Sequence, residues 1–298
     1  QPMLQHQRNK AMTTFKEFQA KYTPIINDFL EGQLAKESDD PRFAEIMAYS
    51  VMAGGKRLRP LLFLATLDAL GVEITEKEVQ AACGIELIHT YSLIHDDLPA
   101  MDNDDYRRGE LTSHKKWGEA EAILAGDALQ PLGIQWIAQA EHNWKLVEII
   151  TEAVGPKGMV AGQYLDIDTT NNEDSSEEVI DHMEWLKTGC LILASVQMAT
   201  ALAACPDQQA KKYLAFAKHF GRSYQLYDDL VDIVESQEEA GKATHKDQEV
   251  GKNNSLTMLG AEVTRNELKQ LIEKGKADLA GEKAEVLLGF LDLYQKVL

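Results

Sequence analysis

The sequence predicts an all-α protein made of a single domain with about ten helices. Apolar residues recur at spacings of three and four over most of the 298 residues, the period of a helix that buries one face. No segment alternates polar and apolar residues like a half-buried strand, and the hairpin dipeptides Asn-Gly and Asp-Gly are absent. The domain is expected to span residues 1–298, with residues 1–11 as a disordered or added segment.

Five segments carry the helical pattern most clearly. The first, residues 15–34, has an amphipathic stripe formed by Phe15, Phe18, Tyr22, Ile26 and Phe29. Three segments are apolar nearly all round and are expected to be buried helices: 76–97, 121–140 and 184–204. The fifth is a long helix over 208–234. Polar breaks lie at 53–60, 98–105 and 169–178, with a longer one, expected to be a mobile lid or loop, at 236–254.

Composition and charge narrow the function classes. The net charge of −18 argues against a nucleic-acid-binding surface and against docking on anionic lipid. We see no apolar run of the roughly 20 residues that a membrane span needs, and the N-terminal residues lack the apolar core of a secretion signal. The cysteines Cys83, Cys190 and Cys205 are expected to be buried thiols in a reducing compartment. We therefore expect a cytoplasmic protein.

An aspartate cluster lies in the segment 224–234, among aromatic and apolar residues. On a helix, Asp228 and Asp232 project within about 40° of each other, while Asp229 points elsewhere. Two neighbouring carboxylates repel each other unless a cation lies between them. The alternative is a solvated acidic helix end, which the apolar flanking residues disfavour.

A second acidic cluster follows the helix predicted at 76–97. Asp96 and Asp102 are six residues apart and would lie on different faces of a continuous helix. Pro99 disfavours helical geometry at Leu98, so the chain can turn and bring Asp102 back toward Asp96. Oxygen ligands without His or Cys in the cluster suit Mg²⁺, with Mn²⁺ as the alternative.

The alternating acids that begin at Asp102 also resemble the calcium-binding loop of an EF-hand. Such a loop needs glycine at its sixth position and glutamate at its twelfth. Here these positions hold Arg107 and Ser113, so we reject a calcium loop.

Basic residues accompany these acidic clusters. The first group, Lys56, Arg57 and Arg59, adjoins two glycines whose amides can approach an anion closely. Further cations lie at Arg107, Arg108, Lys187, Lys242 and Lys252. Acidic clusters for metal and basic clusters for phosphate oxygens together predict a site for two diphosphates. One diphosphate would be bridged by metal and the other held by side-chain cations. His89, two helical turns before Asp96, is a candidate ligand there.

The two aspartate clusters, "HDDLPAMDNDDYRRG" and "DDLVD", together with "GGKRLRP", resemble the short-chain trans-isoprenyl diphosphate synthases. The similarity runs from residue 54 to residue 254 and is strongest to the bacterial farnesyl diphosphate synthases. It implies long, mostly antiparallel helices around a central cavity, usually in a homodimer. It also implies that isopentenyl diphosphate condenses head-to-tail with an allylic diphosphate, dimethylallyl or geranyl, and that no nucleophilic residue is needed.

The resemblance also implies roles for individual residues. The metal ions under the allylic diphosphate would be held by Asp96, Asp102 and Asp228, with support from Asp97 and Asp232. The allylic diphosphate would be held or surrounded by Arg107, Lys187, Thr188, Gln225, Lys242 and Lys252. Isopentenyl diphosphate would be bound by Gly55, Lys56, Arg59, His89 and Arg108. The residues after Lys252 read "NNSLTML", where the family usually has Ser/Thr-Tyr-Pro. The resemblance therefore does not predict how the segment after Lys252 closes, although Lys252 itself is present.

Product length in this family is tuned just before the first aspartate motif, here at Tyr91 and Ser92. A bulky Tyr91, about 7.5 Å below the aspartate on a helix, would form a floor typical of fifteen-carbon products. The first alternative is a geranylgeranyl diphosphate synthase of the same family. A class I terpene cyclase is disfavoured because "DDLVDIVE" lacks its Ser/Thr and has Glu one position early. A non-catalytic subunit is disfavoured because both aspartate motifs are present.

Overall fold

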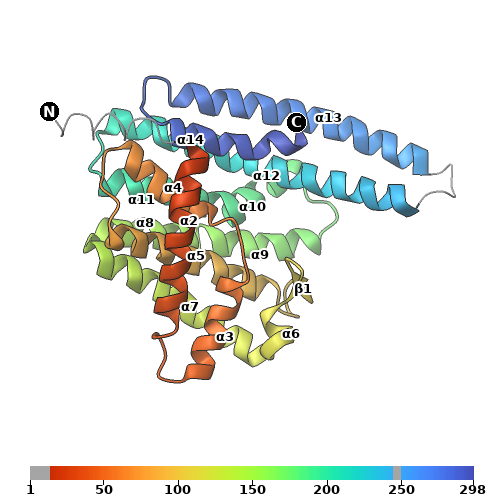
Figure 1. Ribbon diagram of the computed structural model, residues 1–298. Coiled ribbons are helices and arrows are strands. Elements are labelled where there is room, and N and C mark those ends of the chain that lie inside the picture. Colours follow the sequence, from red (N-terminus) through yellow and green to blue (C-terminus); the bar gives the residue numbers. More distant parts are fainter. Residues whose placement is uncertain (1–13, 244–249) are drawn as a thin grey trace.

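The computed structural model describes residues 14–243 and 250–298, with side chains described for residues 14–236 and 260–298. The segment 1–11, predicted to be disordered or added, lies outside the described residues. Helices make up most of the described chain, which confirms the predicted all-α class (Figure 1).

The first half of the chain supplies most of the lower part of the molecule in Figure 1. Its helices are α2 (Phe15–Leu34), α3 (Pro41–Met52), α4 (Leu58–Ala69), α5 (Glu76–Asp96), α6 (Ser113–Trp117), α7 (Glu119–Glu141), α8 (Trp144–Val154) and α9 (Met159–Thr170). The predicted stripe of α2 is confirmed, since Phe18 and Ile26 are buried in the core and Phe15, Tyr22 and Phe29 pack against it.

The second half begins with α10 (Glu177–Glu184), which continues through a π-helical turn, η2 (Trp185–Gly189), into α11 (Cys190–Leu202). It then forms the long pair α12 (Asp207–Ala243) and α13 (Val250–Asp278), which lie side by side at the top of Figure 1. The chain ends with α14 (Glu285–Phe290) and the 3₁₀ helix η3 (Leu291–Val297).

The centre of the fold is the packing of α5 against α7, the most extensive contact between two helices of different parts of the chain. Gly84 and Gly133 make this close approach possible, because a Cβ on either would clash with the carbonyl oxygen of the other. Burial of α5 on nearly all sides, as predicted, places its C-terminal residue Asp96 inside the molecule.

Two predictions about local structure were wrong. Strands β1 (Tyr106–Arg107) and β2 (Glu110–Leu111) form a small hairpin, whose turn at Arg108 and Gly109 has positive φ at both residues. Arg-Gly here replaces the usual dipeptides, so their absence did not exclude a hairpin. The loop predicted at 236–254 is also too long, because helix α12 extends to residue 243 and α13 begins at 250. Ala, Glu, Gln and Lys in this stretch favour helix.

The helical stretch Glu177–Leu202 contains an 18-residue window with a mean hydropathy of 1.3, so by length and composition alone it could cross a membrane. This corrects the prediction that no apolar run approaches the roughly 20 residues of a membrane span. Half of that window is buried inside the molecule, where α11 packs against α4, α8 and α12. Core helices of this kind also have the length and hydropathy of a membrane span. The cysteines are all free, but only Cys83 is fully buried, while Cys190 and Cys205 are partly exposed.

Candidate active site

The acidic cluster of Asp96 and Asp102 folds as Pro99 predicts. After α5 the chain turns at Leu98, and the amide of Asp102 donates a 2.8 Å hydrogen bond to the carbonyl oxygen of Asp96. Asn103 adopts a left-handed conformation, and its amide donates to the carbonyl of Leu98. The turn therefore returns Asp102 to the end of the helix that carries Asp96.

Asp96 is buried, and the groups around it compensate its negative charge only in part. Gln163 Nε2 donates to its Oδ1 at 2.8 Å, and Lys187 Nζ lies 3.9 Å from its Oδ2. Burial raises the pKa of Asp96 to about 6, Lys187 and Gln163 lower it, and the charge of Asp102 raises it further. The pKa of Asp102 is also raised, chiefly by burial. Additional positive charge at this position would stabilise both carboxylates in their ionised form.

Lys187 lies on the π-helical turn η2, a geometry often found at functional sites. Its Nζ is 2.6 Å from Asp166 Oδ2 on α9. Burial lowers the pKa of Lys187, but the bond to Asp166 and the charge of Asp96 outweigh burial and raise it overall. Gly162 permits this arrangement, because a Cβ there would clash with the backbone of Lys187.

Sequence reasoning missed Gln163 and Asp166, although both contact predicted site residues. The two are three residues apart and therefore share one face of α9, directly after Gly162. A glycine followed by polar residues at helical spacing was the available signal.

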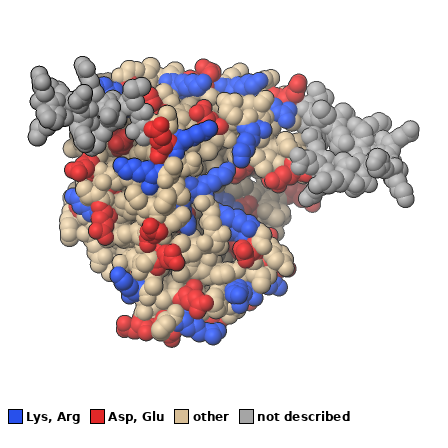
Figure 2. Space-filling model, in the orientation of Figure 1, with Lys and Arg blue, Asp and Glu red and all other residues tan. Residues whose placement is uncertain are grey.

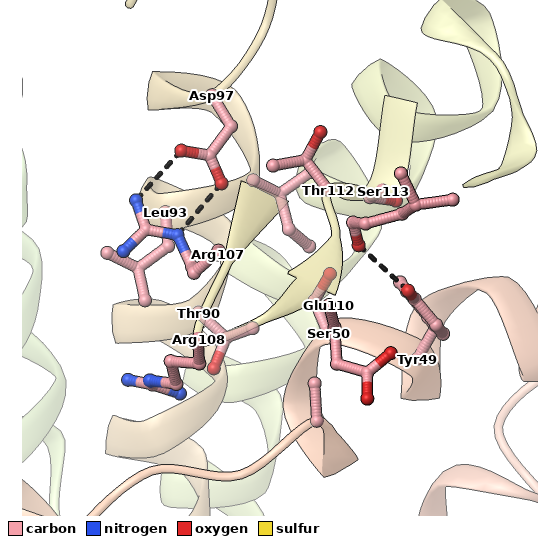
Figure 3. A pocket seen from close by; sticks show the side chains of 13 residues that line it. Tyr49, Ser50, Thr90, Leu93, Asp97, Arg107, Arg108, Glu110, Thr112 and Ser113 are labelled. Carbon is pink, nitrogen blue, oxygen red and sulfur yellow. Dashed lines mark hydrogen bonds and ion pairs between the residues drawn. The ribbon is translucent and has the colours of Figure 1, made fainter. Parts of the chain in front are cut away.

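The β1–β2 hairpin carries two adjacent arginines that have different partners, with Arg107 beside Asp97 and Arg108 farther from it (Figure 3). Arg107 donates two 2.8 Å hydrogen bonds to the buried carboxylate of Asp97, from Nε and from NH2. Arg108 instead donates through NH1 to the carbonyl oxygen of Gly54 at 2.7 Å. The predicted metal-supporting Asp97 and the predicted diphosphate ligand Arg107 are thus paired with each other.

A basic pocket of about 170 Å³ lies where Arg108 meets the loop before α4. All five residues predicted to bind the second diphosphate line it. The lining comprises Gly55, Lys56, Arg57, Leu58, Arg59, Glu86, His89, Arg108 and Tyr224. Gly55 is required here, because its φ is +124° and a Cβ would lie 2.8 Å from the Arg108 guanidinium. The structure therefore brings this predicted group together.

Two groups in the basic pocket are suited to receive an anion. Arg59 is buried, and its Nε has no hydrogen-bond partner among the described groups. Burial, followed by the charges of Arg59 and the other arginines, lowers the pKa of His89 well below its usual value. His89 Nε2 lies 3.4 Å from Arg59 NH1. A neutral His89 and the Nε donor of Arg59 are therefore available to an anion.

The acidic cluster of Asp228 and Asp232 lies close to two lining residues of the basic pocket, Lys56 and Arg59. Burial and the charge of Asp232 raise the pKa of Asp228 to about 6, while Lys56 and Arg59 lower it. This agrees with the prediction that Asp228 and Asp232 share a face of α12. Lys56 Nζ lies 5.3 Å from the centre of the Tyr227 ring, so the loop before α4 approaches α12.

The remaining predicted residues are more scattered. Thr188 lies on η2 beside Lys187. Gln225 lines a different cavity of about 1150 Å³ between α10, α12 and α13, and its Nε2 is buried without a partner among the described groups. The side chains of Lys242 and Lys252 lie outside the described residues.

The predicted chain-length position lies on α5, before Asp96. Tyr91 is buried, its ring centre is 5.6 Å from that of His95, and its hydroxyl accepts a 3.4 Å hydrogen bond from Gln130 on α7. Ser92 Oγ donates to the carbonyl oxygen of His89 at 2.6 Å. Tyr91 is therefore held between α5 and α7.

The donor set suits a hard divalent cation shared with a ligand. Within the described ranges, no three or more His, Cys, Asp or Glu side chains converge to hold an ion by themselves. The carboxylates of Asp96, Asp102 and Asp228 all have raised pKa values. Magnesium keeps several waters and binds through one or two carboxylates plus substrate phosphates, which is compatible with these residues. On the visible face, Lys and Arg side chains line a hollow below α12 (Figure 2).

Known proteins match both the sequence and the fold. Residues 40–287 match the polyprenyl synthetase family. Farnesyl diphosphate synthase of Geobacillus stearothermophilus is 36% identical over 276 residues, covering 90% of this chain and 92% of that protein. Geranylgeranyl diphosphate synthase of Cyanophora paradoxa is 36% identical over 262 residues, 86% of each.

Among solved structures, an FPP/GFPP synthase from Zymomonas mobilis superposes with a TM-score of 0.80 at 32% identity, covering 94% of this chain and 98% of that one. Geranyltransferase from Legionella pneumophila gives a TM-score of 0.77 at 31% identity, covering 95% and 97%. A matched region that spans most of the chain, two paired charge clusters and a shared fold lead to one conclusion: this chain belongs to the polyprenyl synthetase family of prenyltransferases.

Proposed function

We propose that this chain is a Mg²⁺-dependent farnesyl diphosphate synthase. It would condense isopentenyl diphosphate head-to-tail with dimethylallyl or geranyl diphosphate and release diphosphate. The supporting observation is that the basic pocket has acidic residues on two sides. Asp96 and Asp102 lie at the end of α5, the helix that also carries His89 of the pocket, and Asp228 on α12 is influenced by Lys56 and Arg59 of the pocket. A site for one anion would not need both the acidic residues and the basic pocket.

The two sites would share the work of the reaction. Asp96, Asp102 and Asp228 would hold Mg²⁺, which when bound supplies positive charge to the diphosphate that departs. Lys187 lies beside Asp96 and would stabilise the same developing charge. The cations of the basic pocket would orient isopentenyl diphosphate with its double bond toward the allylic carbon. The released diphosphate would take the proton lost after the C–C bond forms, so no protein base is assigned.

Product length in this proposal depends on Tyr91. The farnesyl and geranylgeranyl diphosphate synthases above are equally similar in sequence to this chain, so overall identity does not choose between them. Tyr91 is bulky and held between α5 and α7. It would close the tail pocket after fifteen carbons. Replacing Tyr91 with Ala should shift the product toward twenty carbons or more, read by mass spectrometry of the prenyl alcohols. An unchanged product profile would refute the floor.

The test of the activity itself is a product assay. Isopentenyl diphosphate would be supplied with dimethylallyl or geranyl diphosphate, with Mg²⁺, with Mn²⁺ or with a chelator. We expect a linear fifteen-carbon product that disappears with the chelator. A linear twenty-carbon product would keep the reaction and refute the length assignment. Cyclic hydrocarbons from a prenyl diphosphate alone would indicate a terpene cyclase, and binding without turnover would indicate a non-catalytic subunit.

We also propose a cytoplasmic homodimer. Ile123 and Leu124 on α7 are 39% and 56% exposed, and burial against a second copy would remove this apolar surface from water. Sedimentation analysis should give about twice the 33.2 kDa mass of one chain. A mass of one chain at micromolar concentration would reject the dimer.

A further inference from the structure

Arg57 stands between two predicted diphosphate ligands, Lys56 and Arg59, yet its guanidinium is already bound within the protein. It donates from NH1 to Glu86 on α5 (3.1 Å), and it also contacts α2 and α3. Those contacts are to the side-chain oxygen of Asn27 (2.8 Å) and the carbonyl of Val51 (2.8 Å). Arg57 and the Glu86 side chain are only 3% and 5% exposed.

The backbone of this loop is unusual. Gly54 and Gly55 have φ of +115° and +124°, and Arg57 itself is left-handed with φ 53° and ψ 35°. The left-handed conformation is unfavourable for a non-glycine residue, which keeps it only where surrounding contacts impose it. Three bonds from one guanidinium to three helices supply that constraint. The loop that presents Lys56 and Arg59 is thereby fixed to α2, α3 and α5.

Glu86 gives the pair a second consequence. Its carboxylate lines the same pocket as Lys56, Arg59, His89 and Arg108, where an unpaired negative charge would repel a diphosphate. We infer that Arg57 and Glu86 are positioning residues for the isopentenyl diphosphate group: their buried ion pair holds the anion-binding loop in place and Arg57 itself is not a phosphate ligand. The inference rests on the proposed function.

The direction in which Glu86→Leu changes the Kd for isopentenyl diphosphate distinguishes a positioning role from a purely electrostatic effect. Glu86→Leu removes a carboxylate from an anion pocket and frees Arg57, so electrostatics alone predicts tighter binding of isopentenyl diphosphate. Positioning predicts the reverse, a Kd raised about tenfold or more, which corresponds to about 1.4 kcal/mol. Glu86→Gln keeps an acceptor for Arg57 and should stay within about threefold of the wild type. Titration calorimetry with isopentenyl diphosphate, without metal or allylic substrate, measures each Kd.

A structural role alone must also be excluded. Leu30→Ala, in the core on α2 near Asn27, lowers stability without touching the pocket and should leave the Kd unchanged. The double variant Arg57→Met/Glu86→Leu replaces the ion pair with apolar side chains, which is often neutral for stability. It should keep the thermal midpoint close to that of the wild type and still bind weakly. In steady state, KM for isopentenyl diphosphate should rise in this double variant while KM for the allylic substrate stays constant.

The outcomes distinguish the two levels of the proposal. If the wild type neither binds isopentenyl diphosphate nor condenses it, the proposed function fails. If the wild type does both, and Glu86→Leu or the double variant binds as tightly as the wild type or more tightly, the positioning role is overturned.

Discussion

The acidic and basic sides of the site differ in how completely the protein satisfies its own charges. The carboxylates of Asp96 and Asp228 have pKa values raised to about 6, chiefly by burial. On the basic side, Arg57 is fully bound within the protein and Arg108 is tied to the loop carbonyl of Gly54. The basic side is therefore preassembled, whereas the acidic side requires a cation to complete it. Substitutions on the acidic side should chiefly change rate, and those on the basic side should chiefly change affinity.

The largest expected effect belongs to the acidic side. Asp96→Asn should lower kcat about 10³-fold, equivalent to about 4 kcal/mol of transition-state stabilisation. The reason is that the developing diphosphate charge would lose the carboxylate that recruits its counter-ion. The measurement is kcat at saturating concentrations of both substrates and of Mg²⁺.

The matched control is Asp104→Asn, an exposed aspartate in the same turn. It makes the same chemical change eight residues away and should leave kcat within about twofold, as exposed substitutions usually do. Equal losses from Asp96→Asn and Asp104→Asn would mean that overall acidity of the turn matters, and the contrast between the two sides would not hold.

The basic side should show a smaller and different effect. Arg59→Met keeps the length and apolar stem of the side chain but removes the unsatisfied Nε donor and its charge. KM for isopentenyl diphosphate should rise about 30-fold, about 2 kcal/mol, with kcat within about threefold. Arg42→Met, an exposed arginine on α3, is the control and should change neither constant. A fall in kcat with unchanged KM in Arg59→Met would contradict the expected contrast between rate effects on the acidic side and affinity effects on the basic side.

Local rules predicted well wherever they act over a few residues. Pro99 after a helix predicted the return of Asp102 to Asp96, which the structure confirms. The four-residue spacing of Asp228 and Asp232 predicted a shared face, and the charge of Asp232 does raise the pKa of Asp228. Both features are fixed by helix geometry and by the restriction that proline imposes.

Directions across the tertiary structure were less predictable. Arg57 and Arg59 look equivalent in sequence, but the guanidinium of Arg57 is bound to Glu86, whereas Arg59 Nε has no partner among the described groups. Asp96 and Asp97 are adjacent at the end of α5, yet they have different partners. Asp96 accepts a hydrogen bond from Gln163 on α9, and Asp97 pairs with Arg107 on the hairpin. Charge density in a sequence indicates a site, while the partner of each charge depends on helices distant in the chain.

The smallest predicted effect concerns pH and again separates the two sides. Because the pKa of Asp96 in the folded protein, about 6, exceeds its ordinary value of 3.8, the folded state binds this proton more tightly than the unfolded state. Without divalent metal, this carboxyl should therefore raise the free energy of unfolding by about 1 kcal/mol as pH falls from 7 to 5. The thermal midpoint of the wild type in a chelator should rise relative to that of Asp96→Asn over this window.

The comparison between the two proteins isolates Asp96, since other groups that titrate nearby are common to both. Glu184 is one of these, with a pKa raised to about 7 by burial and neighbouring acids. At pH 7, Mg²⁺ should abolish the difference in thermal midpoint between the wild type and Asp96→Asn. A bound cation stabilises the ionised carboxylate and thereby stabilises the folded state by mass action. Parallel pH profiles for the wild type and Asp96→Asn in a chelator would show that the protein already satisfies Asp96. The distinction between a preassembled basic side and an incomplete acidic side would then be lost.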